Sequence, residues 1–168
     1  MTYTNNFRHA DDIITHLNGI VPGLADPLLR AKYVGFVAVA AVTVYELALK
    51  EIFIQFGQKK HKVLGAYVQS QFDRINGRIR IEIIKGTYAG SFGGNYKDRF
   101  KKHLDKTTEK HLRSVGRDIS SSYENLITWR NDFAHGGKIN TTATYQEATQ
   151  AYEDGKDVLE CLAKAMTK

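Results

Sequence analysis

The long apolar segment from Leu28 to about Phe56 constrains the fold more than any other part of the sequence. Its apolar side chains recur at steps of three and four residues, which is the spacing expected on an α-helix. They point in so many directions that the helix should be buried over most of its circumference. These side chains are Tyr33, Phe36, Val37, Ala40, Val44, Leu47, Ala48, Ile52 and Phe56.

The same segment is too short in its apolar part to cross a membrane. Its most apolar stretch runs for 13 residues, from Tyr33 to Tyr45, before Glu46 interrupts it, whereas a membrane-spanning helix needs about 20. The first residues, MTYTNNFRHADD, lack the basic and apolar regions of a signal peptide. The single cysteine, Cys161, excludes an intramolecular disulfide and multi-cysteine metal sites. We therefore expect a cytoplasmic protein with no membrane association.

Capping residues and turns divide the rest of the chain into further helices. Asp26-Pro27 is a favourable start for the long helix. Asn95 and Asp118 can cap two later helices, and Gly136-Gly137 should end the second of them. A capping box, Thr144 to Glu147, opens a last helix. The first expected helix begins after Asn5 or Asn6 and ends near Gly19. The others run from Leu28 to about Phe56, from Asn95 onward, from Asp118 to Gly136, and from Thr144 to about Met166.

Residues 60–95 are harder to interpret. Their apolar residues fit a helix, but Arg78–Ile83 alternates like a β-strand, and Asn76-Gly77 could interrupt either one. A helix is favoured because no partner strand is apparent and a lone strand cannot satisfy its backbone. We interpret TYAGSFGGN, residues 87–95, as a flexible loop, since it lacks the GK[ST] ending of a phosphate-binding loop. The sequence thus predicts an all-α fold, in which a single domain (residues 1–168) forms a bundle of five or six helices.

The net charge of +6 is concentrated in the middle of the chain. Between Arg74 and Arg117 there are 12 Lys and Arg against 4 Asp and Glu, which is a local charge of +8. Such a segment favours a phosphate-rich partner, because its cations gain by displacing condensed counterions. A solvated helix face has the same composition, so both interpretations stay open.

The segment Trp129–Gly137, WRNDFAHGG, is the best candidate for chemistry. Residues five apart on an ideal helix point about 140° away from each other. Arg130 and His135 can meet at one phosphate only if His135 lies where the helix unwinds, which the glycines permit, or if a second subunit completes the site. No HExxH, DxD, Walker or GxSxG motif is present, so we expect a site with no metal and no cofactor.

An arginine and a histidine suit the cleavage of RNA by its own 2′-hydroxyl. Histidine, with an ordinary pKa near 6.5, can exchange a proton at neutral pH. Arginine offers a permanently charged fork of donors to the developing charge on the phosphoryl oxygens. By itself, Arg-x4-His is also compatible with a structural ion pair or with a histidine that caps a helix.

The string RNDFAHG, with a helix expected on either side, resembles the Arg-x4-6-His signature of the HEPN superfamily. It has the frequent form in which a polar residue, here Asn131, follows the arginine. The long preceding helix is similar too, because members often carry a glutamate there and this chain has Glu46. A carboxylate in so apolar a helix needs a partner, for which Arg130 is the first candidate. An exposed edge position for Glu46 is the alternative.

The resemblance implies a dimerising bundle of four to six helices in which the motif helices form a cleft. It implies a metal-independent endoribonuclease that leaves 2′,3′-cyclic phosphate ends, in a toxin or anti-phage defence role. Arg130 would stabilise the transition state, His135 would be the general acid and base, Asn131 would position the phosphate or His135, and Glu46 would support them. In addition, we expect the basic segment to guide RNA towards the cleft through Lys97, Arg99, Lys101 and Lys102.

The resemblance also implies partners. They are RNA, a second copy of the chain in a homodimer, and an antitoxin or another defence-system protein. One toxin branch of the superfamily carries a modified tyrosine two residues after the histidine, where this chain has Gly137. Control by that modification is therefore not expected.

Two other functions remain open on the sequence. One is a non-catalytic dimeric module that binds RNA or a nucleotide. The other is a structural or partner-binding helical domain in which Arg130 and Glu46 form a buried ion pair, whose removal would reduce stability rather than activity.

Overall fold

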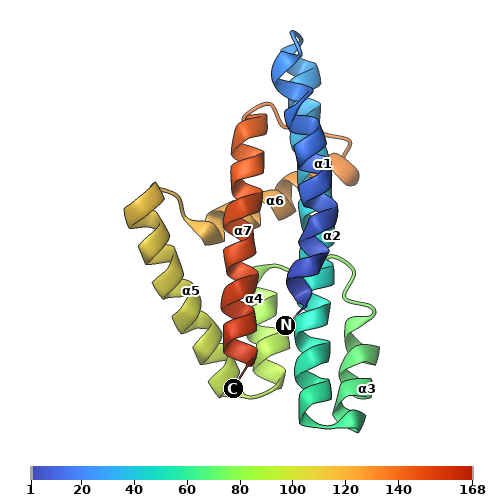
Figure 1. Ribbon diagram of the computed structural model, residues 1–168, viewed down its shortest axis with the longest axis vertical. Helices are drawn as coiled ribbons and strands as arrows, with labels where there is room; N and C mark the ends of the chain where they lie inside the picture. The colour runs from blue at the N-terminus through green and yellow to red at the C-terminus, as the bar shows by residue number, and fades with distance from the viewer. Residues whose placement is uncertain (1, 168) are drawn as a thin grey trace.

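The computed structural model describes residues 2–167 and shows a bundle of helices (Figure 1). These residues contain no β-strand, which confirms the all-α class. Six helices have 11 or more residues, in agreement with the expected five or six, and a seventh, α4, has three. In chain order the elements are the 3-10 helix η1 (Tyr3–Phe7), α1 (Arg8–Asn18), the 3-10 helix η2 (Val21–Gly23), α2 (Pro27–Lys60), α3 (Lys62–Phe72), α4 (Ile81–Ile83), the π-helix η3 (Ile84–Ala89), α5 (Gly94–Val115), α6 (Ile119–Ala134) and α7 (Tyr145–Met166).

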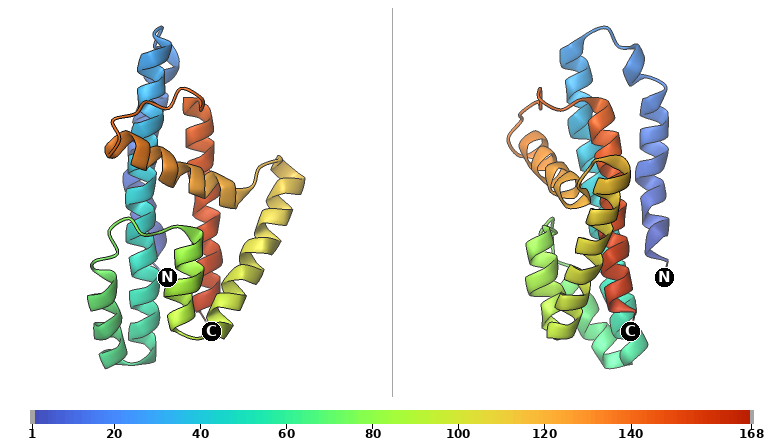
Figure 2. Two further views of the ribbon diagram at one scale, coloured as in Figure 1. Left: turned by 180° about the vertical axis from the view of Figure 1, so that it is seen from behind. Right: turned by 90° about the vertical axis from the view of Figure 1, so that its left-hand side faces the viewer.

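Helix α2 is the axis of the bundle. It begins at Pro27, where the Asp26 side chain accepts a hydrogen bond from the amide of Leu28 (2.8 Å), and it continues for 34 residues, or about 50 Å. Helices α1, α3, α6 and α7 all pack against it (Figures 1 and 2). The predicted caps at Asp118 and Thr144 are confirmed as well. Within residues 2–167, no helix combines the length and the apolar character needed to cross a membrane.

The core is centred on a stack of three tyrosines. The ring of Tyr45 on α2 lies between those of Tyr123 on α6 (5.2 Å between centroids) and Tyr152 on α7 (5.9 Å), and all three are fully buried. Their hydroxyls are satisfied, since that of Tyr45 donates to the carbonyl of Tyr152 (2.5 Å) and that of Tyr123 to the carbonyl of Ile79 (2.8 Å). A side chain at Gly155 would clash with Tyr45, because its Cβ would lie 2.3 Å from the hydroxyl oxygen. The stack therefore joins α2, α6 and α7.

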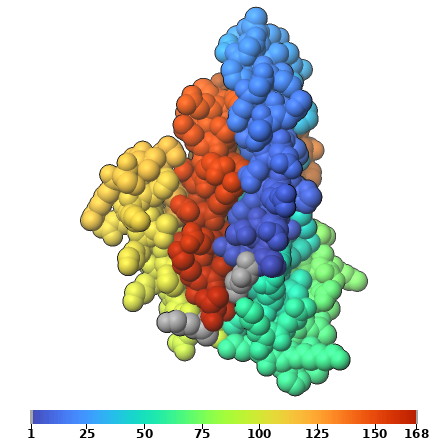
Figure 3. Space-filling model, viewed as in Figure 1, coloured from blue at the N-terminus to red at the C-terminus, as the bar shows by residue number. Residues whose placement is uncertain are grey.

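Helices α1 and α7 lie side by side on the face seen in Figure 3. Asp11 on α1 accepts hydrogen bonds from the Tyr152 hydroxyl (2.7 Å) and from the Lys156 ammonium (2.8 Å) on α7. The lone cysteine, Cys161, is also on α7 and is buried, with its sulfur 3.3 Å from the hydroxyl of Thr107.

The structure resolves the ambiguity of residues 60–95. The preferred helix forms at α3, and no strand forms at Arg78–Ile83, but residues 73–80 are irregular. Asn76 and Gly77 interrupt the helical run, as the sequence allows, because both have positive φ angles (39° and 75°). The chain therefore makes a sharp turn between α3 and α4.

The flexible loop predicted for residues 87–95 is wrong over most of its length. The chain stays helical through Ser91, first as η3 and then as α-helix. Aromatic packing explains this difference, since the Phe92 ring stacks on Phe53 (5.6 Å) and the Tyr88 ring lies 5.1 Å from Phe72. Three glycines in this stretch make a helix less favourable, but burial of two aromatic rings outweighs that cost.

The expectation that Asn95 caps the basic helix is also wrong. Helix α5 begins at Gly94, and its N-cap is Gly93, which makes no side-chain hydrogen bond. Gly93 has a φ angle of 123°, and residues with a side chain rarely adopt this conformation. The chain reverses at this glycine, so the helix starts before Asn95 can cap it.

A buried carboxylate attaches α5 and α6 to α7. Asp154 on α7 is 2% exposed and accepts two hydrogen bonds from the Arg117 guanidinium (both 2.8 Å) and one from the Ser122 hydroxyl (2.8 Å). Nε2 of His111 lies 3.0 Å from Oδ1 of the same carboxylate. Burial alone would raise the pKa of Asp154, but the hydrogen bonds from Arg117 and Ser122 outweigh it and lower the pKa below its ordinary value.

Replacing this carboxylate should destabilise the fold. We expect Asp154→Asn to lower the free energy of unfolding by about 2 to 3 kcal/mol at neutral pH, because the substitution removes the charged acceptor of Arg117 and Ser122. Urea unfolding followed by circular dichroism measures this loss. Asp105→Asn is the control, since Asp105 is an exposed partner of Lys101 (2.6 Å) and should leave stability nearly unchanged. Equal losses in the two variants would contradict the assignment.

The stabilisation by Asp154 should also depend on pH. Because the pKa of Asp154 is lower in the folded chain than in the unfolded chain, its contribution is complete above the unfolded pKa of about 3.9. It is lost as the pH falls through the folded pKa. The difference in stability between wild type and Asp154→Asn should therefore shrink below about pH 4.

Candidate active site

Helix α6 carries the Arg-x4-His motif across the bundle. Its first turn is capped by Asp118, which accepts hydrogen bonds from the amides of Ser120 (2.8 Å) and Ser121 (3.0 Å). Its buried face, which includes Tyr123, Leu126 and Ile127, packs against α2 and α7. The motif lies at the opposite end of α6, where this helix crosses α2 (Figure 2).

Close packing on α2 fixes that end of α6. The Phe133 ring covers Gly35 so closely that a Cβ at this glycine would lie 2.2 Å from ring atoms. The same ring lies 5.2 Å from the ring of Phe36. Any side chain at position 35 would therefore push the motif away from α2.

The helix unwinds at His135. Ala134 is the last helical residue, and His135 has φ and ψ angles of −111° and −32°. The chain then turns through Gly137, which has a φ of 60°, and the amide of Lys138 donates to the carbonyl of Asp132 (2.9 Å). This turn brings Nε2 of His135 to 3.2 Å from Nη1 of Arg130. Of the two arrangements that the sequence allows for this pair, the structure shows the first, within one chain.

The tautomer of a neutral His135 side chain in this contact follows from the arginine. A guanidinium can only donate hydrogen bonds, so Nε2 of His135 must accept, and the neutral imidazole carries its proton on Nδ1. Arg130 is half-buried and His135 is exposed. The site thus combines a half-buried cation with an imidazole that is exposed to solvent.

The Glu46 carboxylate has polar partners, as a carboxylate in an apolar helix requires, but the predicted partner Arg130 is not among them. Its carboxylate pairs with Lys50, one helical turn away (3.0 Å), and accepts a hydrogen bond from the amide of Gly77 (2.7 Å). Among residues 2–167, the structure gives it no ion pair with Arg130. Its side chain is 21% exposed, so it is neither deeply buried nor at an exposed edge.

Gly77 is the site residue that sequence reasoning missed. A Cβ at this position would lie 2.3 Å from Nη2 of Arg130, so the arginine packs directly on the glycine backbone. The signal in the sequence was the pair Asn76-Gly77, which we interpreted only as an interruption of a helix or strand. Nothing local in the sequence connects this pair with a residue more than 50 positions later.

Asn131 lies beside Arg130 in the motif, but its side chain does not hold the contact between Arg130 and His135. The residue is half-buried, and its backbone carbonyl accepts from the amide of His135 (3.0 Å). Its side-chain amide makes no hydrogen bond within the described part of the chain. That amide therefore remains able to contact a phosphate.

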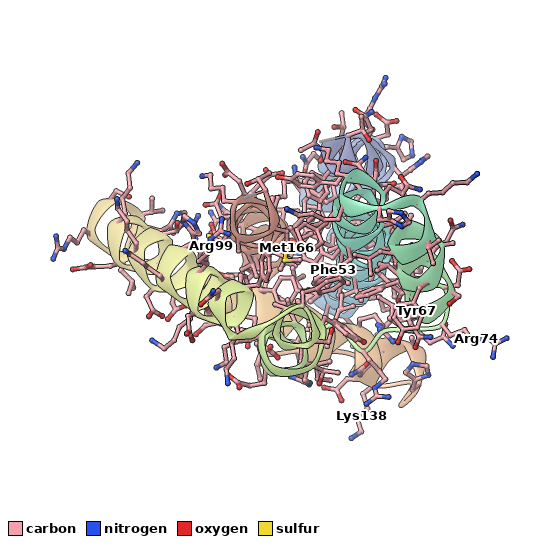
Figure 4. The ribbon with its side chains drawn as sticks, turned by 90° about the horizontal axis from the view of Figure 1, so that it is seen from below. Phe53, Tyr67, Arg74, Arg99, Lys138 and Met166 are labelled. Atoms are coloured by element: carbon pink, nitrogen blue, oxygen red, sulfur yellow. The ribbon has the colours of Figure 1, made fainter. Side chains whose placement is uncertain are left out.

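The structure does not bring the predicted RNA-binding residues of α5 to the motif. Lys97, Lys101 and Lys102 are exposed, and Arg99 donates to the carbonyl of Lys164 on α7 (3.3 Å). Helix α5 meets α6 near the first residues of α6, and the 11 residue steps from Ile119 to Arg130 separate that point from the start of the motif by about 17 Å. Figure 4 accordingly shows Arg99 beside α7. Lys138, which follows the motif, lies at a different edge of the molecule.

The all-helical bundle and the Arg-x4-His motif at the end of α6 agree with the resemblance of the sequence to HEPN domains. The family model described as RiboL-PSP-HEPN matches residues 4–168, which is nearly the whole chain. The protein therefore belongs to this HEPN family. No match to the chain was found among curated proteins or among solved structures.

The contact between Arg130 and His135 should be visible in the tautomer of the histidine. At about pH 8, above the ordinary histidine pKa of about 6.5, long-range ¹⁵N–¹H correlation should show His135 with its proton on Nδ1. Arg130→Ala should move the proton towards Nε2, the nitrogen that neutral imidazole side chains prefer to protonate. A proton on Nε2 in both proteins would contradict the arrangement.

Proposed function

We propose that this protein is a metal-independent endoribonuclease that cleaves RNA by attack of its own 2′-hydroxyl. The observation that carries the proposal is the 3.2 Å contact between the Arg130 guanidinium and the His135 imidazole at the accessible end of α6. The pair joins a permanent cation to an imidazole, a side chain of the type that serves as general acid and base. Membership of a HEPN family supports the same function.

The reaction needs a base for the 2′-hydroxyl, stabilisation of the phosphoryl oxygens and a proton for the 5′-oxygen. When a phosphate accepts the donors of Arg130, Nε2 of His135 loses its hydrogen bond and becomes free to take the proton of the 2′-hydroxyl. Arg130 stabilises the charge that develops on the phosphoryl oxygens, and Asn131 positions the phosphate. The 2′-oxygen then bonds to phosphorus, the bond to the 5′-oxygen breaks, and the protonated His135 supplies a proton to that leaving oxygen. The products end in a 2′,3′-cyclic phosphate and a 5′-hydroxyl.

Removing the imidazole should abolish cleavage without unfolding the protein. In excess EDTA, wild type should convert mixed-sequence RNA to fragments with 2′,3′-cyclic phosphate ends. His135→Ala should be slower by at least about a hundredfold, which is the contribution expected of general acid–base catalysis. Analysis of product ends and circular dichroism measure the two properties.

His16→Ala is the matched control, because His16 is an exposed histidine on α1. It should cleave RNA as fast as wild type. Equal cleavage by wild type and His135→Ala would disprove the assignment. Binding of RNA by both proteins with no product would instead identify a non-catalytic RNA-binding module.

We further propose that the lysines of α5 bind RNA outside the cleavage site. Lys97, Lys101 and Lys102 are exposed on one helix, far enough from the motif to contact a different part of a long RNA. Replacing all three with alanine should reduce the slope of log K against log salt concentration by about 2, since each phosphate contact to a single strand contributes about 0.7. Filter binding at several salt concentrations measures the slope. An unchanged slope would remove these lysines from the interface.

The biological setting that we propose rests on the resemblance to HEPN toxins and defence proteins. The chain would act on RNA in the cytoplasm as a symmetric homodimer, under the control of an antitoxin or another defence-system protein. One observation supports the dimer: Phe36 leaves 51% of its surface exposed while its ring contacts Phe133 of the motif helix. A second copy could cover this apolar surface and bring two motifs to one cleft.

A further inference from the structure

The backbone conformation of the turn between α3 and α4 is restrained by its sequence and by its contacts with the core. Its central residues, Asn76 and Gly77, have φ angles of 39° and 75°, and the amide of Arg78 donates to the carbonyl of Ile75 (3.0 Å). Asn-Gly is the pair that most readily accepts two successive positive φ angles. Ile75 and Ile79 on either side are 5% and 0% exposed, so both ends of the turn are anchored in the core.

The side chain of Arg130, the arginine of the motif, packs against this turn. A Cβ at position 77 would lie 2.3 Å from Nη2, 3.3 Å from Cζ and 3.4 Å from Nη1 of Arg130. The guanidinium thus occupies the space that any side chain at position 77 would fill. The turn limits how far Arg130 can move at Nη2, while Nε2 of His135 lies 3.2 Å from Nη1.

Glu46 holds the turn from the side of α2. One oxygen of its carboxylate, Oε2, accepts the amide hydrogen of Gly77 (2.7 Å), and the other, Oε1, pairs with Lys50 (3.0 Å). The carboxylate therefore fixes the backbone against which the guanidinium packs. Contacts run without interruption from Glu46 through Gly77 and Arg130 to His135.

We propose that Gly77 is a positioning residue for Arg130 and that Glu46 acts on the reaction through the Gly77 amide. This inference rests on the proposed ribonuclease function for its kinetic consequences. The glycine sets the place of the guanidinium, and the carboxylate sets the place of the glycine. Neither residue touches the reacting atoms.

The test compares two glycines that have nearly the same positive φ angle. Gly77 and Gly116 have φ angles of 75° and 76°, but a Cβ at Gly116 would meet no atom within 4 Å. Alanine at either position therefore introduces the strain of a positive φ angle, and only Gly77→Ala displaces Arg130. We expect similar losses of thermal stability in both variants. Only Gly77→Ala should lower kcat, by ten- to a hundredfold, which is the effect of misplacing a catalytic group by about 1 Å.

A second readout does not depend on activity. In Gly77→Ala the guanidinium can no longer hold Nε2 of His135, so the ¹⁵N–¹H spectrum should show the proton moving from Nδ1 towards Nε2. In Gly116→Ala the spectrum should match that of wild type. If wild type cleaves no RNA, this spectrum still tests the positioning, which separates failure of the inference from failure of the proposed function. An unchanged tautomer in folded Gly77→Ala would overturn the inference.

Variants of Glu46 test the other half of the proposal without a new Cβ at the turn. Glu46→Ala removes the acceptor of the Gly77 amide and should lower kcat about tenfold with little change in KM. Glu46→Gln keeps a neutral acceptor and should restore most of the lost activity. If Glu46→Gln is as slow as Glu46→Ala, the charge of Glu46 matters rather than its hydrogen bond, and its action through Gly77 is wrong. This pair also decides the matter if Gly77→Ala fails to fold.

Discussion

Burial of α2 is the constraint on which the rest of the structure depends. Most apolar side chains of this helix must be removed from water, so α1, α3, α6 and α7 each cover part of it, while Phe36 and Leu47 stay 51% and 41% exposed. The covering helices must approach closely, and glycines at the crossings permit this. Gly35 on α2 admits the ring of Phe133, and Gly155 on α7 admits Tyr45. The end of α6 is therefore fixed against α2, and the Arg-x4-His motif is fixed with it.

The two residues of the motif are held to different degrees. Arg130 lies within the helix, half-buried and in contact with the backbone of Gly77, whereas His135 lies after the last helical residue and is exposed. This difference suits their proposed roles. Electrostatic stabilisation of a transition state requires donors that are already in place, and a proton-transferring group must reach both substrate and solvent. A regular helix continued through position 135 would direct the imidazole about 140° away from Arg130.

In residues 60–95 the local sequence signals are not sufficient to determine the secondary structure. The glycines of residues 87–95 favour a loop on local grounds, but the rings of Tyr88 and Phe92 pack on Phe53 and Phe72 and keep the chain helical. The contacting rings come from segments separated by 16 residues or more along the chain, and no local rule describes them. The charge of α5 is a similar case. The sequence places many cations there, yet it does not show on which side of the bundle α5 lies.

The sequence by itself determined the all-α class, the long α2 helix, the caps at Asp26, Asp118 and Thr144, and the motif residues Arg130 and His135. These features depend on spacing and on side chains near in sequence, where periodicity and capping chemistry act directly. Tertiary structure alone decided that the arginine and histidine meet within one chain and that Glu46 binds Gly77 and Lys50 rather than Arg130. The Glu46 carboxylate needed a partner, but which group came within reach depended on how α2, α6 and the turn at Gly77 pack together.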